Sequence, residues 1–169
     1  MSLNYVECAR RTIQKIQYIT IATVCAEAGG RPWNSPVYSA FDSDYNFFWM
    51  SDRKSQHSKN IQNNPYIFLA IYDSTIPEGT GAGQGVYIQA QAEELSDAGR
   101  VSRAHQLVAS RVGKKLRPAK DFLGDAPRRI YRATLEKMWV NDIVEKEGFR
   151  IDVRVEIDPA LLRTGHNVV

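Results

Sequence analysis

The chain has 169 residues, of which 43% are apolar and 24% charged, a balance typical of a soluble globular domain with a sizeable core. The formal net charge is only +3, and the basic residues are spread along the sequence. Proteins that bind nucleic acids usually concentrate basic residues on one face, so we expect no nucleic-acid partner. The densest basic segments, residues 114–117 and 128–129, are short enough to be interpreted as solvated surface.

The N-terminal segment and the two cysteines predict a cytoplasmic protein. No long apolar run precedes a small-residue cleavage site, and no apolar stretch approaches the ~20 residues of a membrane span, so no membrane partner is expected. Cys8 and Cys25 belong to no Cys-x-x-Cys pair and have no histidine cluster beside them. We therefore expect two reduced thiols and no metal site.

The first half of the chain reads as one amphipathic helix followed by short strands and tight turns. Apolar residues at helical spacing mark the helix, and segments rich in β-branched and aromatic residues mark the strands. The final helix of this half should end before Pro65, because the residue preceding a proline is pushed out of helical geometry. The expected elements are a helix over residues 3–16, strands over 17–25, 35–41 and 46–50, and a helix over 56–63.

The second half begins with an apolar run of strand length and a glycine-rich loop, residues 73–85. The loop is not a phosphate loop of the dinucleotide type, because a strand-like segment follows it instead of a helix; we interpret it as a mobile connection. Ser96 is the expected N-cap of the next helix, and His105 falls beside the apolar stripe of that helix. The expected elements are strands over 66–72 and 86–92, a helix over 96–112, and strands over 129–141 and 148–158.

These elements indicate a mainly β (α+β) fold. Six or seven strands and two principal helices are linked mostly by short turns, which favours an antiparallel barrel or sandwich over a doubly wound parallel sheet. Residues 148–158 alternate cleanly between apolar and charged side chains, as in an antiparallel strand with one solvated face. We expect a single domain over residues 1–169, with its core over about 5–157 and a flexible tail over 163–169.

The most informative segment is the polar run over residues 51–60, which follows the third predicted strand. Within ten residues it contains three serines, basic side chains, a histidine and an asparagine, and a short helix should begin there. Helix N-termini present unpaired N–H groups and partial positive charge, which favour phosphate. Ser51 and Ser55 would donate hydroxyls, while Lys54 and a protonated His57 would add charge. This combination points to a phosphorylated cofactor.

An ordered set of segments resembles the flavin-binding split β-barrel group that includes pyridoxamine 5′-phosphate oxidase. The resemblance covers roughly residues 5–157, and no single piece is specific, but their order and spacing are. The pieces are a first strand over residues 19–24, a Gly-Gly-Arg-Pro-Trp turn, the strand over 34–39, Phe48-Trp-Met-Ser51, Ser55-x-His57-x-x-Asn60 and Asn64-Pro65.

The resemblance implies a homodimer that holds flavin mononucleotide (FMN) in a groove at the subunit interface, with a small-molecule substrate. It also implies which residues lie along each part of the cofactor. The implied contacts are Asn34, Ser35, Pro36 and Val37 along the isoalloxazine, Met50 and Ser51 beside the ribityl chain, Ser55, Gln56 and His57 at the phosphate with Lys54 and Asn60 close by, and Trp139 approaching the flavin from the same or the partner subunit. No residue is nominated as catalytic acid or base.

Departures from the family pattern argue against pyridoxamine phosphate as the substrate. Gln56 and His57 replace an arginine–lysine pair, Asn34 and Ser39 stand where relatives carry basic residues, and residues 145–149 replace an arginine–histidine signature. A substrate phosphate would therefore lack its usual partners. The resulting expectation is an FMN-dependent oxidoreductase with another substrate.

Three alternatives remain open from the sequence. The barrel could be a non-catalytic flavin- or haem-binding carrier, or a reductase that uses a deazaflavin in place of FMN. It could also bind nucleic acid through the aromatic residues over 45–49, although the low, dispersed charge argues against this.

Overall fold

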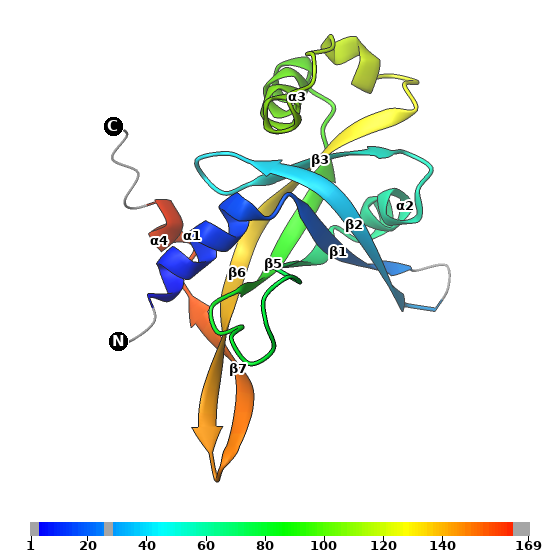
Figure 1. The fold of residues 1–169 in the computed structure, drawn as a ribbon. Helices are drawn as coiled ribbons and strands as arrows, with labels where there is room; N and C mark the ends of the chain where they lie inside the picture. Colours follow the sequence, from blue (N-terminus) through cyan, green and yellow to red (C-terminus); the bar gives the residue numbers. More distant parts are fainter. Residues whose placement is uncertain (1–3, 26–28, 164–169) are drawn as a thin grey trace.

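The structure, a computed structural model, describes residues 4–25 and 29–163 (Figure 1). All the strands and both principal helices expected from the sequence are present, and two short helical segments are additional. The elements are α1 (Tyr5–Lys15), β1 (Tyr18–Cys25), β2 (Arg31–Phe41), β3 (Phe47–Asp52), α2 (Gln56–Asn63), β4 (Tyr66–Tyr72), β5 (Gly85–Glu94), α3 (Ala98–Val112), the 3₁₀ turn η2 (Ala119–Phe122), β6 (Arg128–Lys146), β7 (Phe149–Ile157) and α4 (Ala160–Arg163).

The seven strands form one antiparallel sheet that closes on itself. Their order is β3-β2-β1-β4-β5-β6-β7, and an additional pairing of β3 with β6 closes the first six into a ring. Residues 47–52 of β3 pair with residues 128–133 of β6, while β7 pairs only with β6. The predicted antiparallel split β-barrel is therefore confirmed. The closure by β3 and β6 also brings the end of β3 beside the start of β6.

The core fills the barrel with every second side chain of its strands. Trp49 stacks on Tyr131 inside the ring, with ring centroids 5.6 Å apart. A second apolar cluster lies on the outside, where α3 covers β2 and β3. In Figure 1, α3 lies above the barrel and α2 lies to its right. The two faces of β3 are thus both covered, the inner one by the core and the outer one by α3.

Two ends differ from the sequence-based expectation. The side chain of Asp97, not Ser96, caps α3 by accepting from the N–H of Arg100 at 2.8 Å. Arg163 ends α4, and the rest of the expected flexible tail, residues 164–169, lies outside the described residues, as does Ala28 of the turn before β2.

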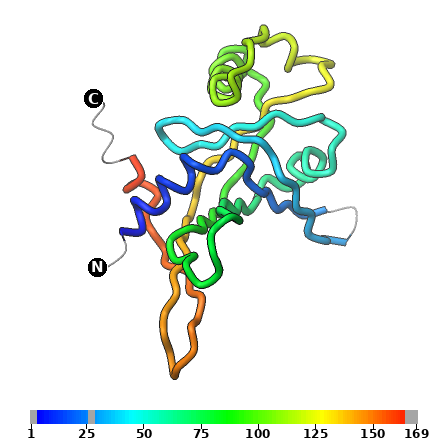
Figure 2. Tube along the Cα trace, viewed as in Figure 1, coloured from blue at the N-terminus to red at the C-terminus, as the bar shows by residue number. Residues whose placement is uncertain are grey.

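The hairpin formed by β6 and β7 extends away from the barrel (Figure 2). Its tip is solvated on both faces: Phe149 is 72% exposed, and burial begins only at the far end of β7, with Ile157. The expected strand with one solvated face is therefore found only where β7 approaches the barrel. Toward the tip, the apolar side chains of Phe149 and Ile151 are exposed.

The glycine-rich loop between β4 and β5 is fastened to β6. Asn141 accepts from the N–H of Gly85 at 2.7 Å and donates to the carbonyl of Gly81 at 2.9 Å. The carbonyl of Asn141 also accepts from the N–H of Gly83 at 2.8 Å. A single side chain with its backbone thus holds the loop at three points.

Two leucines test the location of the core. Leu69 is fully buried in the barrel, whereas Leu116 is 61% exposed in the segment after α3. Leu69→Ala should lower the free energy of unfolding by about 2–5 kcal/mol, because a cavity replaces packed methyl groups. Leu116→Ala, the matched control, should change it by less than about 0.5 kcal/mol. Urea unfolding of both variants measures the difference, and equal effects would contradict this core.

Candidate functional site

The end of β3 and the start of α2 form a tight polar corner. Asp52 organises it: its carbonyl accepts from the N–H of Ser55 at 3.0 Å, and its carboxylate accepts from the N–H of Lys54 at 2.8 Å. Such a side-chain hydrogen bond two residues along the chain is a characteristic turn former. The turn sets the direction in which α2 leaves the barrel.

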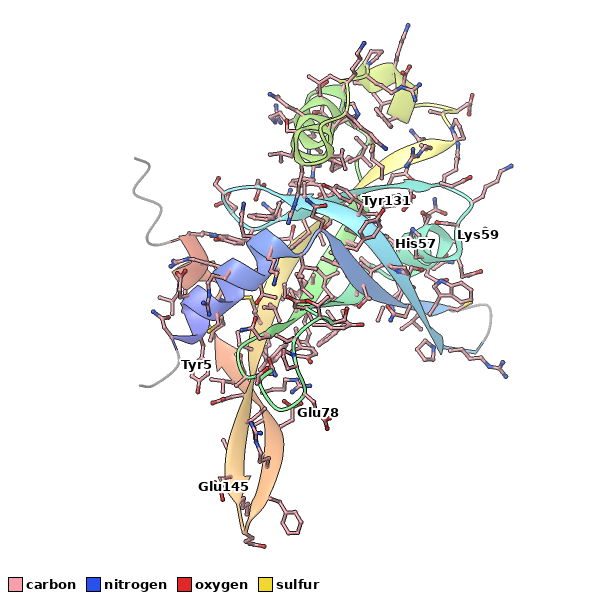
Figure 3. All side chains as sticks on the ribbon, in the orientation of Figure 1. Tyr5, His57, Lys59, Glu78, Tyr131 and Glu145 are labelled. Atoms are coloured by element: carbon pink, nitrogen blue, oxygen red, sulfur yellow. The ribbon has the colours of Figure 1, made fainter. Side chains whose placement is uncertain are left out.

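Three serines surround His57 at this corner. Nε2 of His57 lies 2.7 Å from Oγ of Ser51 and 3.1 Å from Oγ of Ser55. Its Nδ1 lies 3.2 Å from Oγ of Ser35. We call these four residues the serine–histidine cluster; it brings together predicted site residues from β2, β3 and α2. Figure 3 shows His57 between β2 and α2.

His57 lies in surroundings that disfavour its charged form. Its side chain is buried, and burial lowers its pKa below the ordinary value near 6.5, because the charged form loses its hydration. The lowered pKa favours the neutral ring at pH 7, whereas the sequence predicts a protonated His57. The neutral ring can instead hold the serine hydroxyls in place through both of its nitrogens.

The N-terminus of α2 has no side-chain cap. Ser55 occupies the capping position, but its hydroxyl donates to Oγ of Ser58 at 2.9 Å and contacts His57 instead of capping the backbone. The first N–H groups of a helix have no partner within the helix. An anion at this end would meet the positive end of the helix dipole and the N–H of the partly exposed Gln56, whereas the fully buried Ser58 keeps its N–H out of reach.

The other two predicted residues of α2 hold the helix against β1. Asn60 is buried and donates to Oγ1 of Thr23 at 2.9 Å. Gln56 donates to Oδ1 of Asn60 at 2.9 Å and contacts Sγ of Cys25 at 3.4 Å. Both amides therefore act as positioning groups that hold α2 against β1.

Two adjacent cations flank the uncapped helix end. The Lys54 side chain is exposed and that of Arg53 is half-buried, and neither makes an ion pair within residues 4–25 and 29–163. The backbone of Arg53 donates to the carbonyl of Pro127 at 2.9 Å, which fixes the turn against the start of β6. Arg53 was not predicted as a site residue; its place beside Lys54 in the polar run was the available signal.

The predicted residues of β2 divide between the two faces of the strand. Asn34 and Pro36 are exposed on the outer face, whereas Val37 is buried in the barrel core and Ser35 contacts the inward-facing His57. Alternation of side chains along a strand requires this division. Only Asn34 and Pro36 can therefore present side chains to a ligand outside the barrel.

Met50 and Trp139 lie in different surroundings. Met50 is half-buried on the outer face of β3 and lines a cavity beneath α3. Trp139, on β6, stacks on Phe68 with ring centroids 6.4 Å apart and pairs in register with Tyr87. We call Phe68, Tyr87 and Trp139 the aromatic face. No hydrogen bond or ring contact of the described residues joins it directly to the serine–histidine cluster.

The buried histidine makes stability depend on pH. Below about pH 6.5 the unfolded chain binds a proton at His57 that the folded protein binds only at lower pH, so stability should fall as the pH drops from 7 to 5. His57→Asn, which does not titrate, should show a shallower decline, because only His105 then keeps a lowered pKa among the described histidines. Urea unfolding across this range measures both slopes, and identical slopes would contradict a buried neutral His57.

Comparison with known proteins agrees with this fold. The family model described as pyridoxamine 5′-phosphate oxidase matches residues 6–142. No curated protein sequence matches the chain. Within the described residues, no helix has the length and apolar character needed to cross a bilayer.

Several solved structures share the architecture. A haem-binding protein from Mycobacterium smegmatis superposes with a TM-score of 0.67 at 16% identity, covering 96% of this chain but only 61% of its own. The haem storage protein HutZ from Vibrio cholerae has a TM-score of 0.65 at 19% identity, covering 83% and 95%. An F420 reductase has a TM-score of 0.56 at 17% identity, covering 82% and 98%. These identities show a shared fold, and the family match over most of its length shows that this chain belongs to the pyridoxamine 5′-phosphate oxidase family.

Proposed function

We propose that the protein is a flavoprotein oxidoreductase that binds FMN with the cofactor phosphate at the N-terminus of α2. The observation that carries the proposal is the uncapped helix end, flanked by Arg53 and Lys54 and set on the serine–histidine cluster. A ribityl phosphate carries nearly two negative charges. Each charge-assisted hydrogen bond to it contributes about 1.5–3 kcal/mol, so two or three such contacts supply useful affinity.

Different residues of this corner supply the positive charge and hold the hydroxyl donors in place. Arg53, Lys54 and the backbone N–H groups of α2 provide the positive potential. The neutral His57 orients Ser51 and Ser55 and adds no charge that would have to be desolvated. Preorganised donors bind an anion better than mobile ones, because less conformational entropy is lost on binding.

The ring system would extend from the phosphate along the outer side of β2. Asn34 and Pro36 are exposed there, and Met50 lies on the outer face of the neighbouring strand. When bound, the isoalloxazine would supply the redox chemistry by accepting and releasing a hydride. The chain's own residues would orient the ring and exclude water from it.

A homodimer with two equivalent sites fits the aromatic face. Phe68 is 36% exposed and Tyr66, on the same strand, is 60% exposed. Neighbouring aromatic rings exposed on one surface are typical of a face that another protein covers. The guanidinium of Arg154 lies 4.0 Å from the ring centroid of Tyr87 at the edge of this face. We propose that a second copy covers the aromatic face, so that Trp139 approaches the flavin of the other subunit.

Haem and deazaflavin are the competing cofactors. Both ring nitrogens of His57 contact serine hydroxyls. The ring of His57 therefore offers no open nitrogen to iron, which favours a flavin-type cofactor at this corner.

The absorbance spectrum of the purified protein tests the class of cofactor. We expect the paired bands of an oxidised flavin, either as purified or after adding FMN, and a rise in melting temperature with excess FMN because the ligand binds only the folded state. A single deazaflavin band or an intense haem band would identify another cofactor. A colourless protein that FMN does not stabilise would overturn the proposal.

Charge removal tests the phosphate position. Arg53→Gln/Lys54→Gln should weaken FMN binding at least tenfold, because it replaces two charge-assisted contacts with weaker neutral ones. The control, Lys59→Gln/Lys146→Gln, removes the same charge from exposed positions on the outer side of α2 (Figure 3) and at the hairpin tip. Fluorescence titration measures both affinities. Equal weakening in the two variants would mean that only net charge matters.

A further inference from the structure

Hydrogen bonds extend the serine–histidine cluster beyond His57 in two directions. On the side of β2, the indole N–H of Trp33 donates to Oγ of Ser35 at 3.0 Å, and the same Oγ lies 3.2 Å from Nδ1 of His57. On the other side, Oγ of Ser55 donates to Oγ of Ser58 at 2.9 Å. The cluster is therefore the middle part of a longer series of polar contacts.

The series continues from α2 to the ends of β5 and β6. The side chain of Ser58 hydrogen-bonds with the phenol of Tyr131, and the Tyr131 hydroxyl donates to the carboxylate of Glu94 at 3.2 Å. Ser58 and Tyr131 are fully buried, so bulk water does not compete for these contacts. We call the whole series the hydrogen-bond chain; in order, it consists of Trp33, Ser35, His57, Ser55, Ser58, Tyr131 and Glu94.

The two ends of the hydrogen-bond chain can each take only one role. The indole N–H of Trp33 can only donate, and the carboxylate of Glu94 can only accept. Glu94 also forms an ion pair with Arg129, whose Nε lies 3.1 Å from the carboxylate. A hydroxyl between these ends has one proton to donate, so each donor fixes the direction of the contact before it.

This direction places the proton of His57. Tyr131 donates to Glu94, so Ser58 has to donate to Tyr131, and Ser55 in turn donates to Ser58. The proton of Ser55 is then used, and only an N–H at Nε2 of His57 can complete the 3.1 Å contact between them. A proton on Nδ1 instead would bring two lone pairs together at this contact.

The same assignment satisfies the other two serines of the cluster. With its proton on Nε2, His57 accepts at Nδ1 from Ser35, whose oxygen accepts from Trp33. Nε2 also faces Oγ of Ser51 at 2.7 Å, so that serine receives a hydrogen bond and keeps its own proton. Ser51 makes no other hydrogen bond within residues 4–25 and 29–163. Its hydroxyl is therefore available as a donor to a ligand.

We propose that Glu94 and Tyr131 are positioning residues of the cofactor site. Through the hydrogen-bond chain they keep the proton of His57 on Nε2 and leave the Ser51 hydroxyl free to donate to the cofactor phosphate. The phosphate role rests on the proposed FMN function. The direction of the hydrogen-bond chain depends only on contacts within the protein.

The tautomer of His57 can be measured in the flavin-free, full-length protein. In a ¹⁵N-labelled sample, two-bond ¹H–¹⁵N correlation spectra distinguish protonated from unprotonated ring nitrogens, and the signals lost in His57→Asn identify the ring. We expect a protonated Nε2 and an unprotonated Nδ1 at neutral pH. The opposite tautomer, or a mixture of the two, would overturn the proposed direction.

Glu94→Gln should reverse the hydrogen-bond chain while keeping its shape. The amide oxygen should face the Arg129 cation, so the amide NH₂ faces Tyr131 and donates to it. Each hydroxyl must then turn around, and Ser55 donates to Nε2 of His57. We therefore expect the ring proton to move to Nδ1, a change that lost packing alone would not produce. An unchanged tautomer in this variant would overturn the positioning role.

Flavin affinities test the phosphate role. Glu94→Gln reverses the hydrogen-bond chain and Tyr131→Phe interrupts it, so in both variants the proton of Ser51 is drawn to an unprotonated Nε2. Affinity for FMN should fall about tenfold, because one charge-assisted hydrogen bond is lost, and affinity for riboflavin should not change. Tyr5→Phe, the matched control, removes a phenol that donates to the Asp142 carboxylate at 2.7 Å and should affect neither flavin.

The outcomes separate this inference from the proposed function. A loss confined to FMN supports the phosphate role, whereas equal losses for FMN and riboflavin, or no loss for either, would overturn it. A protein that binds neither flavin would contradict the proposed function and the phosphate role together. The tautomer of the flavin-free protein would still decide the direction of the hydrogen-bond chain.

Discussion

The hydrogen bonds of His57 to three serines are the interaction on which the candidate site depends. They connect β2, the end of β3 and the first turn of α2 through one buried ring. Because both nitrogens are used, the ring cannot turn without losing a partner. The direction of the helix end is therefore fixed from inside the barrel, while Gln56 in its first turn remains partly exposed.

Polar residues near a site thus serve two different purposes. Asn60 and Gln56 fasten α2 to β1, and His57 fixes the serines, whereas Arg53 and Lys54 remain at the surface beside the helix end. Removing a buried positioning group also leaves unpaired polar atoms in the interior, which lowers stability. The exposed cations are for that reason the better probes of ligand binding.

Much of the fold was predictable because local patterns agree with it. The helix over 56–63 and the strand over 66–72 have the predicted ends, since a polar run, a proline and an apolar run mark them. The extra length of β6 was not predictable, because its charged end projects into solvent. A strand that packs on no core does not need alternating apolar and polar residues, so the sequence carries no strand pattern there. The ring closure between β3 and β6 is a long-range pairing that the sequence does not mark.

The assembly of the serine–histidine cluster was predictable from the sequence, but its burial was not. The serines and His57 meet as the polar run predicted, but no periodic pattern in so polar a segment indicates that the histidine is buried. The cavity beneath α3 was not predictable, since Lys114 and Arg128 look like ordinary surface residues until the barrel brings them together. Burial and convergence, both tertiary properties, account for these differences.

The central claim is that the N-terminus of α2 binds the phosphate of a flavin. Riboflavin and FMN differ only in that phosphate, so their dissociation constants for the full-length protein test the claim most directly. Two charge-assisted contacts of about 1.5–3 kcal/mol each predict that FMN binds at least a hundredfold more tightly. Equal affinity for the two flavins, or no binding of either, would contradict it.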